Sequence, residues 1–484
     1  MSGEVKPSRL GEWIDQRIGW RQLMHEGLNE PIPGGSRWAD VFGSGLLFIF
    51  INQIVTGVAL SLYYVPSADH AHTSVSFIHK EVTAGAFIRS LHSYGSSVMV
   101  VVLLLHLFQT YAYGAYKSRR ELVWLFGCTL FLLVLGMSFT GYLLPWDQKA
   151  YSATAVATNM LSEVPGIGNG LKTLMRGGTE MGTITISRFF TLHVFVVPAL
   201  IVGAVAGHVF LFRRAGAAGP PVRAEERDKL IPEPYFPKQV FKDFVFGIAV
   251  IGLLSVLASQ WPAGIGPKAN PADPTYLPRP EWYYVPVFQW IKYWHGPASV
   301  VGIVLIPAAL FLALFALPFV DRAPERRPWR RPFAMGSLIA VFGGLIFLGA
   351  RSRAEDREDD AVRTKLLAQT EAEQRFAMRP FEPEESSTGM CTAGPRRLSA
   401  QESKGALLFV NESCAGCHGK EGKGGAGLYQ LADRSQTPSD ELKSLMLKPT
   451  AEMLAGSMEP SELASEDLDA LVAYMRAVSA NKEQ

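Results

Sequence analysis

Four histidines stand in two apolar stretches of this 484-residue sequence, at intervals that could place them on one face of a helix. His92 and His106 are 14 residues apart, and His193 and His208 are 15 residues apart. At about 1.5 Å and about 100° per residue, each pair lies roughly 21 Å apart along an α-helix and on nearly the same face. If the two helices are parallel, the histidines meet as two stacked pairs. Because neutral imidazole is a strong axial ligand of haem iron, the pattern predicts two haems, one above the other.

A single histidine in an apolar helix is more often a hydrogen-bonded core residue than an iron ligand. Four histidines at matched spacing favour the ligand interpretation, because ionisable groups within a membrane are costly and usually functional. Glycines repeat the interval: Gly43 and Gly57 are 14 residues apart, and so are Gly127 and Gly141. The missing side chains at those depths would let a flat macrocycle approach the backbone.

Seven apolar runs, each near the ~20 residues needed to cross a bilayer, are expected to position these residues. They cover residues 40–62, 86–111, 121–144, 189–212, 243–260, 299–319 and 333–350. The composition agrees with a membrane protein that carries soluble parts, since 48% of residues are hydrophobic, 19% are charged and the net charge is +2. Nothing in it indicates nucleic-acid binding. We therefore predict an all-α fold, a seven-span transmembrane helical bundle with a two-haem four-helix core.

Positive charge predicts the orientation of the bundle. Basic residues follow the second, fourth and sixth spans: Lys117, Arg119, Arg120; Arg213, Arg214, Arg223, Arg227, Lys229; Arg322, Arg326, Arg327, Arg330 and Arg331. These loops and the N-terminus are expected on the cytoplasmic side, which leaves the C-terminus outside. The second and fourth spans are then parallel, as the haem geometry requires. His92 pairs with His193 near the outer face, and His106 pairs with His208 near the inner face.

Residues 1–38 lack the pattern of a signal peptide and are expected to stay attached. Within them Leu10, Trp13, Ile14 and Ile18 recur at helical spacing among charges, as in a helix lying in the membrane interface or in an ordinary surface helix.

Arginines and a carboxylate lie beside the predicted outer haem. Arg89 and Arg188 precede the outer histidines, where each could cap a span or neutralise a haem propionate. The long outer loops, 145–187 and 261–298, are rich in proline, glycine and aromatic residues. Glu281 in this setting has reason to titrate near neutrality and carry protons, although an interfacial aromatic belt with a solvated glutamate would look the same.

These motifs together resemble cytochrome b of the cytochrome bc complexes, the quinol-oxidising respiratory and photosynthetic reductases. The resemblance covers about residues 30 to 350. It is carried by the four histidines, the spaced glycines and two stretches, Gly141-Tyr142-Leu143-Leu144-Pro145-Trp146 and Pro280-Glu281-Trp282-Tyr283. The 15-residue interval, Leu-Pro-Trp-Asp-Gln and the seven spans resemble the photosynthetic branch, in which the polypeptide is usually split in two. Lys242-Asp243 resembles the respiratory branch, so the chain is a mixed, fused version.

The resemblance implies chemistry at two quinone pockets. Quinol is oxidised near the outer face in a pocket around Pro280, Glu281, Trp282, Tyr283 and Tyr142, with Glu281 as a proton acceptor. One electron goes to an iron–sulfur partner, and the other passes through the outer and inner b haems to quinone near the inner face. Arg213, Lys242 and Asp243 match positions of that inner pocket, although they could equally be interfacial anchors.

Two cysteines of the membrane and linker parts are expected to be without a role in haem attachment. The photosynthetic branch attaches a further haem through a cysteine where this chain has Val41, so no third haem is expected in the membrane part. Cys128 is expected to be an inert packing residue of the third span. Residues 351–399 are charged and contain proline, as in a linker, and Cys391 within them is either incidental or a free thiol.

Cys414-Ala415-Gly416-Cys417-His418 is the attachment motif of a c-type haem, although such a motif alone could be a metal or redox site. The two thiols would bond the haem and His418 would bind the iron. The tail resembles a small single-haem cytochrome c over about residues 400 to 480, with a closing helix over 465–475 that Ser465 caps. Met446, Met453 and Met458 are the candidates for the sixth ligand. Met458 best matches the ligand loop, but Glu459 stands where the family usually has proline, which leaves Met453 as the alternative.

The predicted organisation is an N-terminal interfacial segment (1–38), a four-helix dihaem core (39–215), a three-span part (216–350), a charged linker (351–399) and an α-helical cytochrome c domain (400–484). We expect the core subunit of a proton-translocating quinol:cytochrome c oxidoreductase in a bacterial cytoplasmic membrane, with the C-terminal domain on the periplasmic side. No candidate iron–sulfur site is present, which implies a Rieske-type partner. The resemblance also implies a cytochrome c acceptor and a homodimer in membrane lipid. A non-bifurcating quinol dehydrogenase and a non-catalytic haem scaffold are the alternatives.

Overall fold

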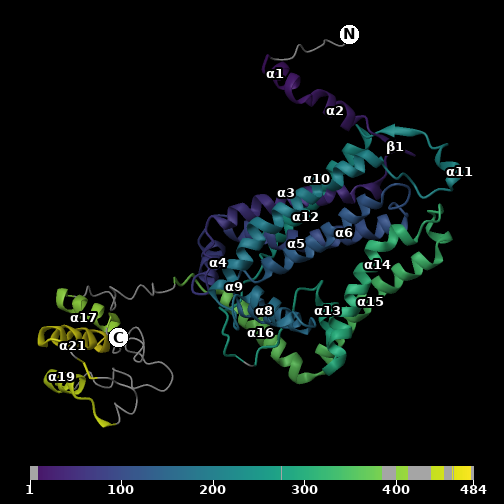
Figure 1. The fold of residues 1–484 in the computed structure, drawn as a ribbon. Coiled ribbons are helices and arrows are strands. Elements are labelled where there is room, and N and C mark those ends of the chain that lie inside the picture. The colour runs from purple at the N-terminus through teal and green to yellow at the C-terminus, as the bar shows by residue number, and fades with distance from the viewer. Residues whose placement is uncertain are drawn as a thin grey trace. The chain divides into compact units, whose positions relative to one another are not determined.

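The computed structural model describes residues 9–273, 275–383, 399–411, 438–451, 460–461 and 463–480. The chain divides into two compact units, Met1–Pro383 and Glu384–Gln484, and both are built mainly of helices in their described parts (Figure 1).

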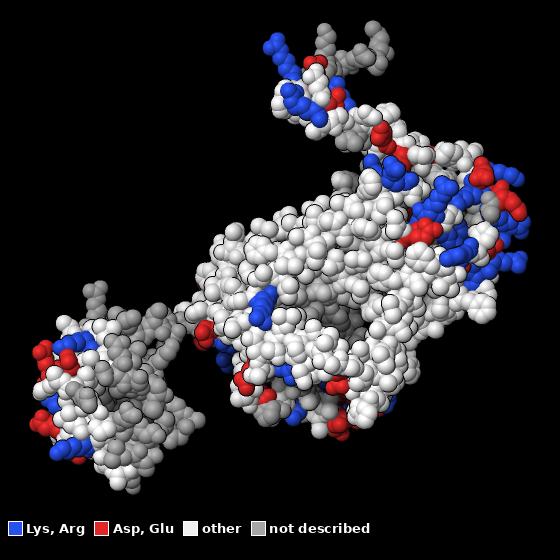
Figure 2. Space-filling model, in the orientation of Figure 1, with Lys and Arg blue, Asp and Glu red and all other residues white. Residues whose placement is uncertain are grey.

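The described residues of the first unit include seven helical segments long and apolar enough to span a membrane, which confirms the seven-span prediction. They are α3 (Phe42–Ser61), α5 (Gly85–Ala112), α6 (Glu121–Tyr142), the continuous segment Thr183–Ala215, α12 (Lys238–Gln260), the segment Gly296–Val320 and α15 (Pro332–Glu358). Their side chains are mostly white in Figure 2, while lysine, arginine, aspartate and glutamate gather toward the ends of this unit. The uncharged belt between the ends is the surface that a bilayer covers.

Two of the seven spans contain a π-helical turn. The fourth comprises α9 (Thr183–Thr191), the π turn η3 (Leu192–Val196) and α10 (Val197–Ala215). The sixth comprises the π turn η5 (Val301–Leu305) and α14 (Ile306–Val320), preceded by the short η4 (Gly296–Ala298). A proline, Pro198 or Pro307, stands at the start of the α-helix after each π turn. Proline lacks an N–H and clashes with the carbonyl four residues earlier, so a wider turn relieves the conflict.

Four spans make the core that holds the histidines. Helix α3 packs against α5, and α6 packs against α10. Helix α12 closes over α3 and α5, where Phe246 sits against Gly45 and Phe48 against Gly247. Buried Ile49, Met99, Val102, Val250 and Leu254 fill this contact. Cys128 is buried beside Tyr116 and Trp124, as expected of a packing residue.

The long connections at one end of the bundle are folded segments. They contain α4 (Ala71–Lys80), α7 (Gln148–Met160), η2 (Leu161–Glu163), α8 (Gly168–Arg176) and α13 (Val285–Ile291). Asp147 caps α7 by accepting from the Ala150 N–H at 2.8 Å. The backbone of Trp146 and Gln148 pairs with that of residues 267–269. These bonds join the two loops that follow the third and fifth spans.

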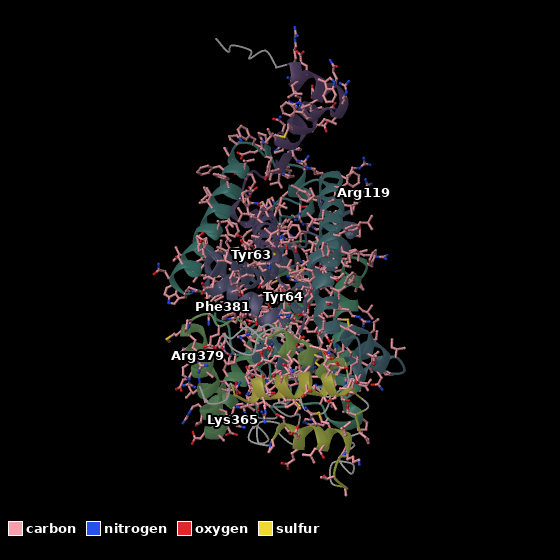
Figure 3. All side chains as sticks on the ribbon, turned by 90° about the vertical axis from the view of Figure 1, so that its left-hand side faces the viewer. Tyr63, Tyr64, Arg119, Lys365, Arg379 and Phe381 are labelled. Atoms are coloured by element: carbon pink, nitrogen blue, oxygen red, sulfur yellow. The ribbon has the colours of Figure 1, made fainter. Side chains whose placement is uncertain are left out.

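The opposite end carries the short β-structure and the basic loops. Strand β1 (Pro31–Pro33) pairs antiparallel with β2 (Pro232–Pro234), and η1 (Trp38–Asp40), α11 (Ala224–Arg227) and η6 (Pro328–Arg330) lie in the same connections. The Arg120 guanidinium donates to the carbonyls of residues 215–217, and that of Arg326 donates to those of residues 218 and 219. The three basic loops of the sequence therefore meet at one end of the bundle. Figure 3 shows Arg119 at this end and Lys365 and Arg379 at the other.

Helices α1 (Arg9–Ile18) and α2 (Trp20–Leu28) precede the bundle. Leu10, Trp13 and Ile18 are exposed on α1, which buries none of its residues. An exposed apolar stripe among charges is the pattern of a helix lying in a membrane interface.

Residues 351–383 differ from the predicted linker. Helix α15 continues to Glu358, and α16 (Asp360–Met378) follows with Asp359 as its N-cap. Arg279 binds Asp356 through two hydrogen bonds of 3.0 and 2.5 Å, which holds the end of α15. Composition misled the prediction because charged residues suit an exposed helix face as well as a linker.

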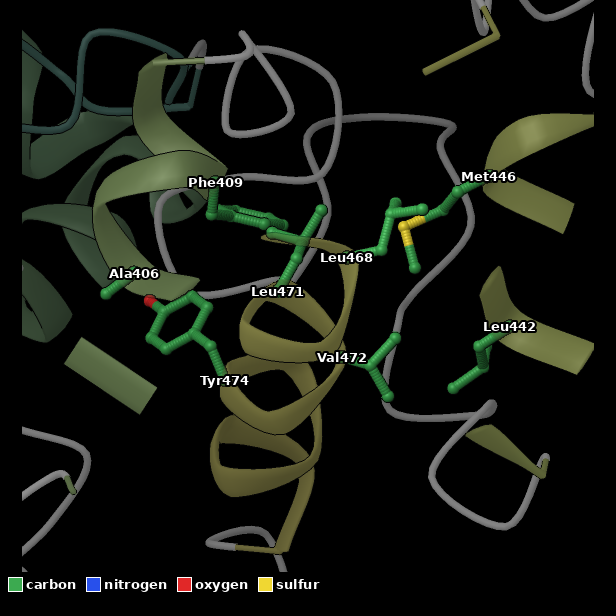
Figure 4. Close-up of a cluster of buried hydrophobic side chains, with 8 residues drawn as sticks. All are labelled: Ala406, Phe409, Leu442, Met446, Leu468, Leu471, Val472 and Tyr474. Atoms are coloured by element: carbon green, nitrogen blue, oxygen red, sulfur yellow. The ribbon is translucent and has the colours of Figure 1, made fainter. Parts of the chain in front are cut away.

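The second unit contains α17 (Ala400–Asn411), α19 (Ser439–Leu447) and α21 (Ser465–Ala480). Their contact is a cluster of Ala406, Phe409, Leu442, Met446, Leu468, Leu471, Val472 and Tyr474 (Figure 4). The predicted closing helix is present, but the N–H of Leu468 bonds to the carbonyl of Ala464, so Ser465 is the first helical residue and not the cap.

Candidate functional site

The four histidines lie inside the four-helix core, two on α5 and two on the fourth span. The rings of His92 and His193 lie next to each other in an edge arrangement, with centroids 6.1 Å apart and planes at 80°. Half of this distance is about 3 Å, which matches a metal–nitrogen bond of about 2 Å plus about 1 Å from the nitrogen to the ring centre. This pair fits an iron held between two imidazoles.

Each glycine of the two spaced pairs faces one histidine. A Cβ placed on Gly57 would lie 3.1 Å from Cε1 of His92, and one on Gly141 would clash with Cε1 of His193. At the other end of the core, Gly43 faces His106 at 3.5 Å and Gly127 faces His208 at 3.3 Å, measured in the same way. The glycines of α3 therefore lie beside the histidines of α5, and the glycines of α6 lie beside the histidines of the fourth span. A side chain would clash with the imidazole ring at Gly141 and crowd it at Gly57 and Gly127, whereas at Gly43 its Cβ would make an ordinary contact.

Hydrogen bonds select the tautomer of the outer pair. The Nδ1 of His193 donates to the carbonyl of Met137 at 3.0 Å. The hydroxyl of Thr56 donates to the carbonyl of Asn52 at 2.6 Å and so accepts from the Nδ1 of His92 at 2.9 Å. A proton on Nδ1 leaves the lone pair of Nε2 available for a metal, and the bond fixes the ring orientation.

The inner histidine of the fourth span repeats this arrangement more loosely. On α6, Val123 stands four residues before Gly127, just as Met137 stands four residues before Gly141. None of the described residues gives the buried Nδ1 of His208 a hydrogen bond of normal geometry.

The π turn explains how unequal histidine intervals reach matching positions. The turn η3 contains His193, and a π turn holds about one residue more than an α turn. The 15 residues between His193 and His208 therefore cover nearly the same rotation as the 14 residues between His92 and His106.

The two arginines predicted beside the outer histidines bind backbone carbonyls. Arg89 donates to the carbonyls of Ala263 and Gly264 and lies 3.4 Å from Nδ1 of His79. Arg188 donates to the carbonyl of Leu174. These bonds agree with the capping alternative, because both guanidinium groups hold outer loops against the spans.

The Pro280–Tyr283 stretch lies directly before α13, at the end of the core that carries His92 and His193, which the sequence predicts to be the outer end. Glu281 pairs with Lys149 of α7 at 3.3 Å, and its side chain is 31% exposed. Trp282 is 43% exposed, and its Nε1 donates to the hydroxyl of Ser97 at 3.3 Å. Burial, together with the charge of Glu281, raises the pKa of Tyr283 to about 12, so its hydroxyl keeps its proton at neutral pH. The carboxylate therefore stands among aromatic rings with one cation beside it.

Tyr142 ends the third span at the same level. Its hydroxyl is buried without a hydrogen-bond partner among the described residues. A buried hydroxyl without a partner is costly, and a polar ligand in the pocket would satisfy it.

The three residues predicted for the inner pocket lie in two places. Asp243 is 5% exposed and accepts from Tyr235 at 2.5 Å and from Gln239 at 2.9 Å. Lys242 donates to the carbonyl and the hydroxyl of Ser36 at 2.8 and 3.0 Å. Arg213 is half exposed and lies 3.9 Å from Glu30. Lys242 therefore joins α12 to the segment that follows β1, and Asp243 joins α12 to the segment that follows β2.

Three family profiles match the chain in the order of its parts. The profile described as cytochrome b/b6/petB matches residues 31–216, that of the cytochrome b C-terminal part (b6/petD) matches 268–368, and that of cytochrome c matches 402–479. The cytochrome b of Cereibacter sphaeroides is 31% identical over 373 residues, which cover 71% of this chain and 83% of the relative. The chain belongs to the cytochrome b family, and it carries a C-terminal cytochrome c domain.

Other similar proteins also carry names of cytochrome b or of cytochrome bc complexes. The "Cytochrome b/c1" of Bradyrhizobium diazoefficiens is 34% identical over 72% of this chain, and the match spans about half of that relative, 52%. The "Menaquinol:cytochrome c reductase cytochrome b subunit" of Geobacillus thermodenitrificans is 38% identical over 44% of this chain and 99% of the relative. A solved "Hyperthermophilic respiratory Complex III" chain has the same fold, with a TM-score of 0.63 and 24% identity over 76% of this chain and 99% of its own. The two kinds of domain imply haem b and haem c.

Residues of the cytochrome c site lie mostly outside the described part of the chain. Cys414, Cys417 and His418 are among them, as are Met453, Met458 and the linker cysteine Cys391. Met446 is described, and it packs against Leu442 and Leu468 in the core of this unit.

Sequence reasoning missed two charged residues of the outer site. Lys149 directly follows the Leu-Pro-Trp-Asp-Gln motif, so its position beside that motif was an available signal. Glu373 stands on α16, and its Cγ lies 3.3 Å from a Cβ placed on Gly266, with the Asp147 carboxylate 3.6 Å from the same point. No local pattern connects Glu373 with residues more than 90 positions earlier.

Proposed function

We propose that this chain is the core electron-transfer subunit of a quinol:cytochrome c oxidoreductase. The observation that carries the proposal is the arrangement of the core histidines, in which two helices present facing imidazoles and four glycines open the space around them. His92 and His193 would hold an outer b haem, and His106 and His208 an inner one. When bound, the b haems supply one-electron transfer between the two faces of the membrane.

The outer pocket is proposed to oxidise quinol. Oxidation of quinol to quinone releases two protons and two electrons. Glu281, as a carboxylate, would accept one of these protons, while Lys149 stabilises the charged form before the transfer. Tyr142, Pro280, Trp282 and Tyr283 would surround the ring, and the unpartnered Tyr142 hydroxyl would bond to a quinol oxygen.

The inner pocket is proposed to reduce quinone. Asp243 and Lys242 stand together at the start of α12, where they could supply a proton and a positive charge to a quinone oxygen. Arg213 stands at the end of α10, on the same side of the bundle.

The C-terminal domain is proposed to carry a c-type haem as the outer electron carrier. Cys414 and Cys417 would hold it covalently, with His418 and Met458 as axial ligands and Met453 as the alternative to Met458. The burial of Met446 among leucines supports its exclusion from the ligand set.

A complex and an orientation follow from this proposal. The basic end of the bundle would face the cytoplasm of a bacterial cell, and the outer pocket and the C-terminal domain would face the periplasm. We propose a Rieske-type iron–sulfur protein as the partner that takes one electron from quinol, a soluble or membrane cytochrome c as acceptor, and a homodimeric assembly.

Quinol-dependent reduction of the b haems tests the function. Anaerobic membranes that contain the complex are mixed with a short-chain quinol, and the two b haems are followed by their absorption. We expect reduction of both haems and an increase in reduced haem when an inner-site inhibitor is added. Insensitivity to every inner-site inhibitor would favour a dehydrogenase that passes both electrons outward. Absence of quinol-dependent reduction would favour a non-catalytic haem scaffold.

A further inference from the structure

Helix α16 brings a carboxylate to the outer pocket from beyond the matched part of the family. The cytochrome b C-terminal match ends at residue 368, and Glu373 lies five residues later in the same helix. This residue is half-buried. It is therefore a feature of this chain that the family profile leaves undescribed.

The position of α16 is fixed by contacts on both sides of Glu373. Gln369 exchanges two hydrogen bonds of 3.2 Å with the backbone of Leu277, in the loop that leads to Glu281. Phe376 packs on His72 with ring centroids 5.1 Å apart, and its carbonyl accepts from Lys80 at 3.0 Å. After the helix, the ring of Phe381 packs against that of Phe77, with centroids 5.4 Å apart. The Phe77 ring also lies 6.4 Å from that of Tyr63. Figure 3 labels Phe381 and Tyr63.

An ion pair and two further carboxylates come together at this place. Lys149 forms its ion pair with Glu281, and Asp147 and Glu373 both approach Gly266. Asp147 is committed to the backbone, because it accepts from the N–H groups of Ala150 and Gly266. Glu373 makes no comparable bond in the described part of the chain, and so its charge acts on the cation through space.

The electrostatics of the group agree with this geometry. Burial would lower the pKa of Lys149, but the carboxylates of Glu281, Glu373 and Asp147 outweigh it and raise that pKa above its ordinary value. Burial raises the pKa of Glu373, Lys149 lowers it, and the charges of Asp147 and Glu281 raise it further. The protonation of Glu373 is therefore coupled to that of the acid–base pair at the quinol pocket.

Other titratable groups border α16 without entering this group. Tyr276 lies in the loop before Pro280, and burial, together with the charge of Glu373, raises its pKa above the ordinary value. His72 and Lys80 face Phe376 from α4. Glu371 and Arg375 pair with each other at 3.4 Å on the exposed side of the helix.

We propose that Glu373 sets the pH range of quinol oxidation by sharing Lys149 with Glu281, an inference that rests on the proposed function. Glu281 must be a carboxylate to accept a proton from quinol. Lys149 favours that form, whereas a negative Glu373 competes for the cation and disfavours it. Glu373 acts through Lys149, and so it is a positioning residue.

Opposite substitutions test the sharing. In Glu373→Gln, Lys149 serves Glu281 alone, so the acid limb of the pH–rate profile should move to lower pH by about 0.5 to 1 unit. In Lys149→Gln, the same limb should move to higher pH. Rates are measured as b-haem reduction by a short-chain quinol in membranes with the assembled complex, after the b-haem content of each variant has been matched.

Two controls separate charge from packing. Glu373→Asp keeps the charge and should keep the wild-type profile, and Glu371→Gln removes a charge from the exposed side of the same helix and should also leave it unchanged. A Glu373→Gln profile that superimposes on wild type, an equal shift in Glu373→Asp, or a Lys149→Gln shift to lower pH would each overturn the proposal. If the Glu373→Gln variant does not assemble, the Lys149→Gln variant tests the proposal alone: a shift of its acid limb to higher pH supports the proposal, and a shift to lower pH overturns it.

A Glu281→Gln variant measured alongside distinguishes failure of this inference from failure of the proposed function. If Glu281→Gln slows quinol oxidation and Glu373→Gln changes nothing, only the role of Glu373 is wrong. If Glu281→Gln has no effect, the role of the outer pocket itself is wrong.

Discussion

The outer and inner histidine pairs share one sequence pattern but differ in what surrounds them. At the outer end, His92 and His193 each bond through Nδ1, and Gly141 leaves no room for a side chain. At the inner end, the Nδ1 of His208 lacks such a bond among the described residues, and a Cβ on Gly43 would make only an ordinary contact. Spacing along a helix places an imidazole, but its orientation depends on side chains and carbonyls of the neighbouring helix.

The largest effect is expected from replacing single histidines, because each replacement should remove one b haem and leave the other. Replacing His92 or His193 with leucine should remove the outer b haem and leave the inner one, while the same change at His106 or His208 should do the reverse. The reason is that each proposed iron would lose one of its two axial ligands and would have no replacement within its pair. Reduced-minus-oxidised spectra and redox titration of membranes measure both haems. Two intact bis-histidine haems in any of these variants would contradict the assignment.

A smaller effect is expected at the outer pocket. Glu281→Gln keeps the shape of the side chain but cannot accept a proton, so quinol oxidation should slow by about 10²-fold or more with normal haem content. Lys242→Gln serves as the matched change at the inner end and should leave quinol oxidation at the outer end intact. A Glu281→Gln rate equal to wild type at every pH would refute the role of this carboxylate.

The glycines should tolerate alanine unequally. In Gly141→Ala the new methyl group meets the His193 ring, and overpacking of this kind costs about 1 to 3 kcal/mol, so the outer haem should be partly lost. In Gly43→Ala the nearest atom of His106 is 3.5 Å away, and the higher helix propensity of alanine should offset the contact. The ratio of haem to protein and the thermal stability of the two purified variants make the comparison. Equal losses would show that the outer end is no tighter than the inner end.

The smallest effect concerns the tautomer bond at His92. Thr56→Val removes the acceptor of the Nδ1 proton, which makes the imidazole a weaker donor to ferric iron, so the outer haem potential should rise by roughly tens of millivolts. Thr56→Ser retains the hydroxyl and should keep the wild-type potential. The inner haem potential is an internal reference, and a shift of both haems would argue against a local hydrogen bond.

The spans and the histidine positions could be predicted because they depend on local properties. A run of about 20 apolar residues crosses a bilayer whatever its neighbours are, and a fixed rise per residue places His92 and His106 at set depths. The pairing of each glycine with its histidine required knowledge of which helices touch. The π turn at His193 had only an indirect sequence signal, the unequal intervals and Pro198.

The helical structure of the charged stretch after residue 350 could not be predicted from the sequence. Its composition suits a linker and an exposed helix equally. The contacts of α16 with Leu277 and with α4 are what hold this stretch as a helix against the bundle. The amino-acid sequence determined the seven spans, and it carries the predictions of the haem ligands and of the c-type attachment motif, since each is a pattern within one short stretch. The tertiary structure decided that Glu373 and Asp147 both lie beside Gly266, because proximity between residues more than 200 positions apart depends on the packing of whole helices and not on local preference.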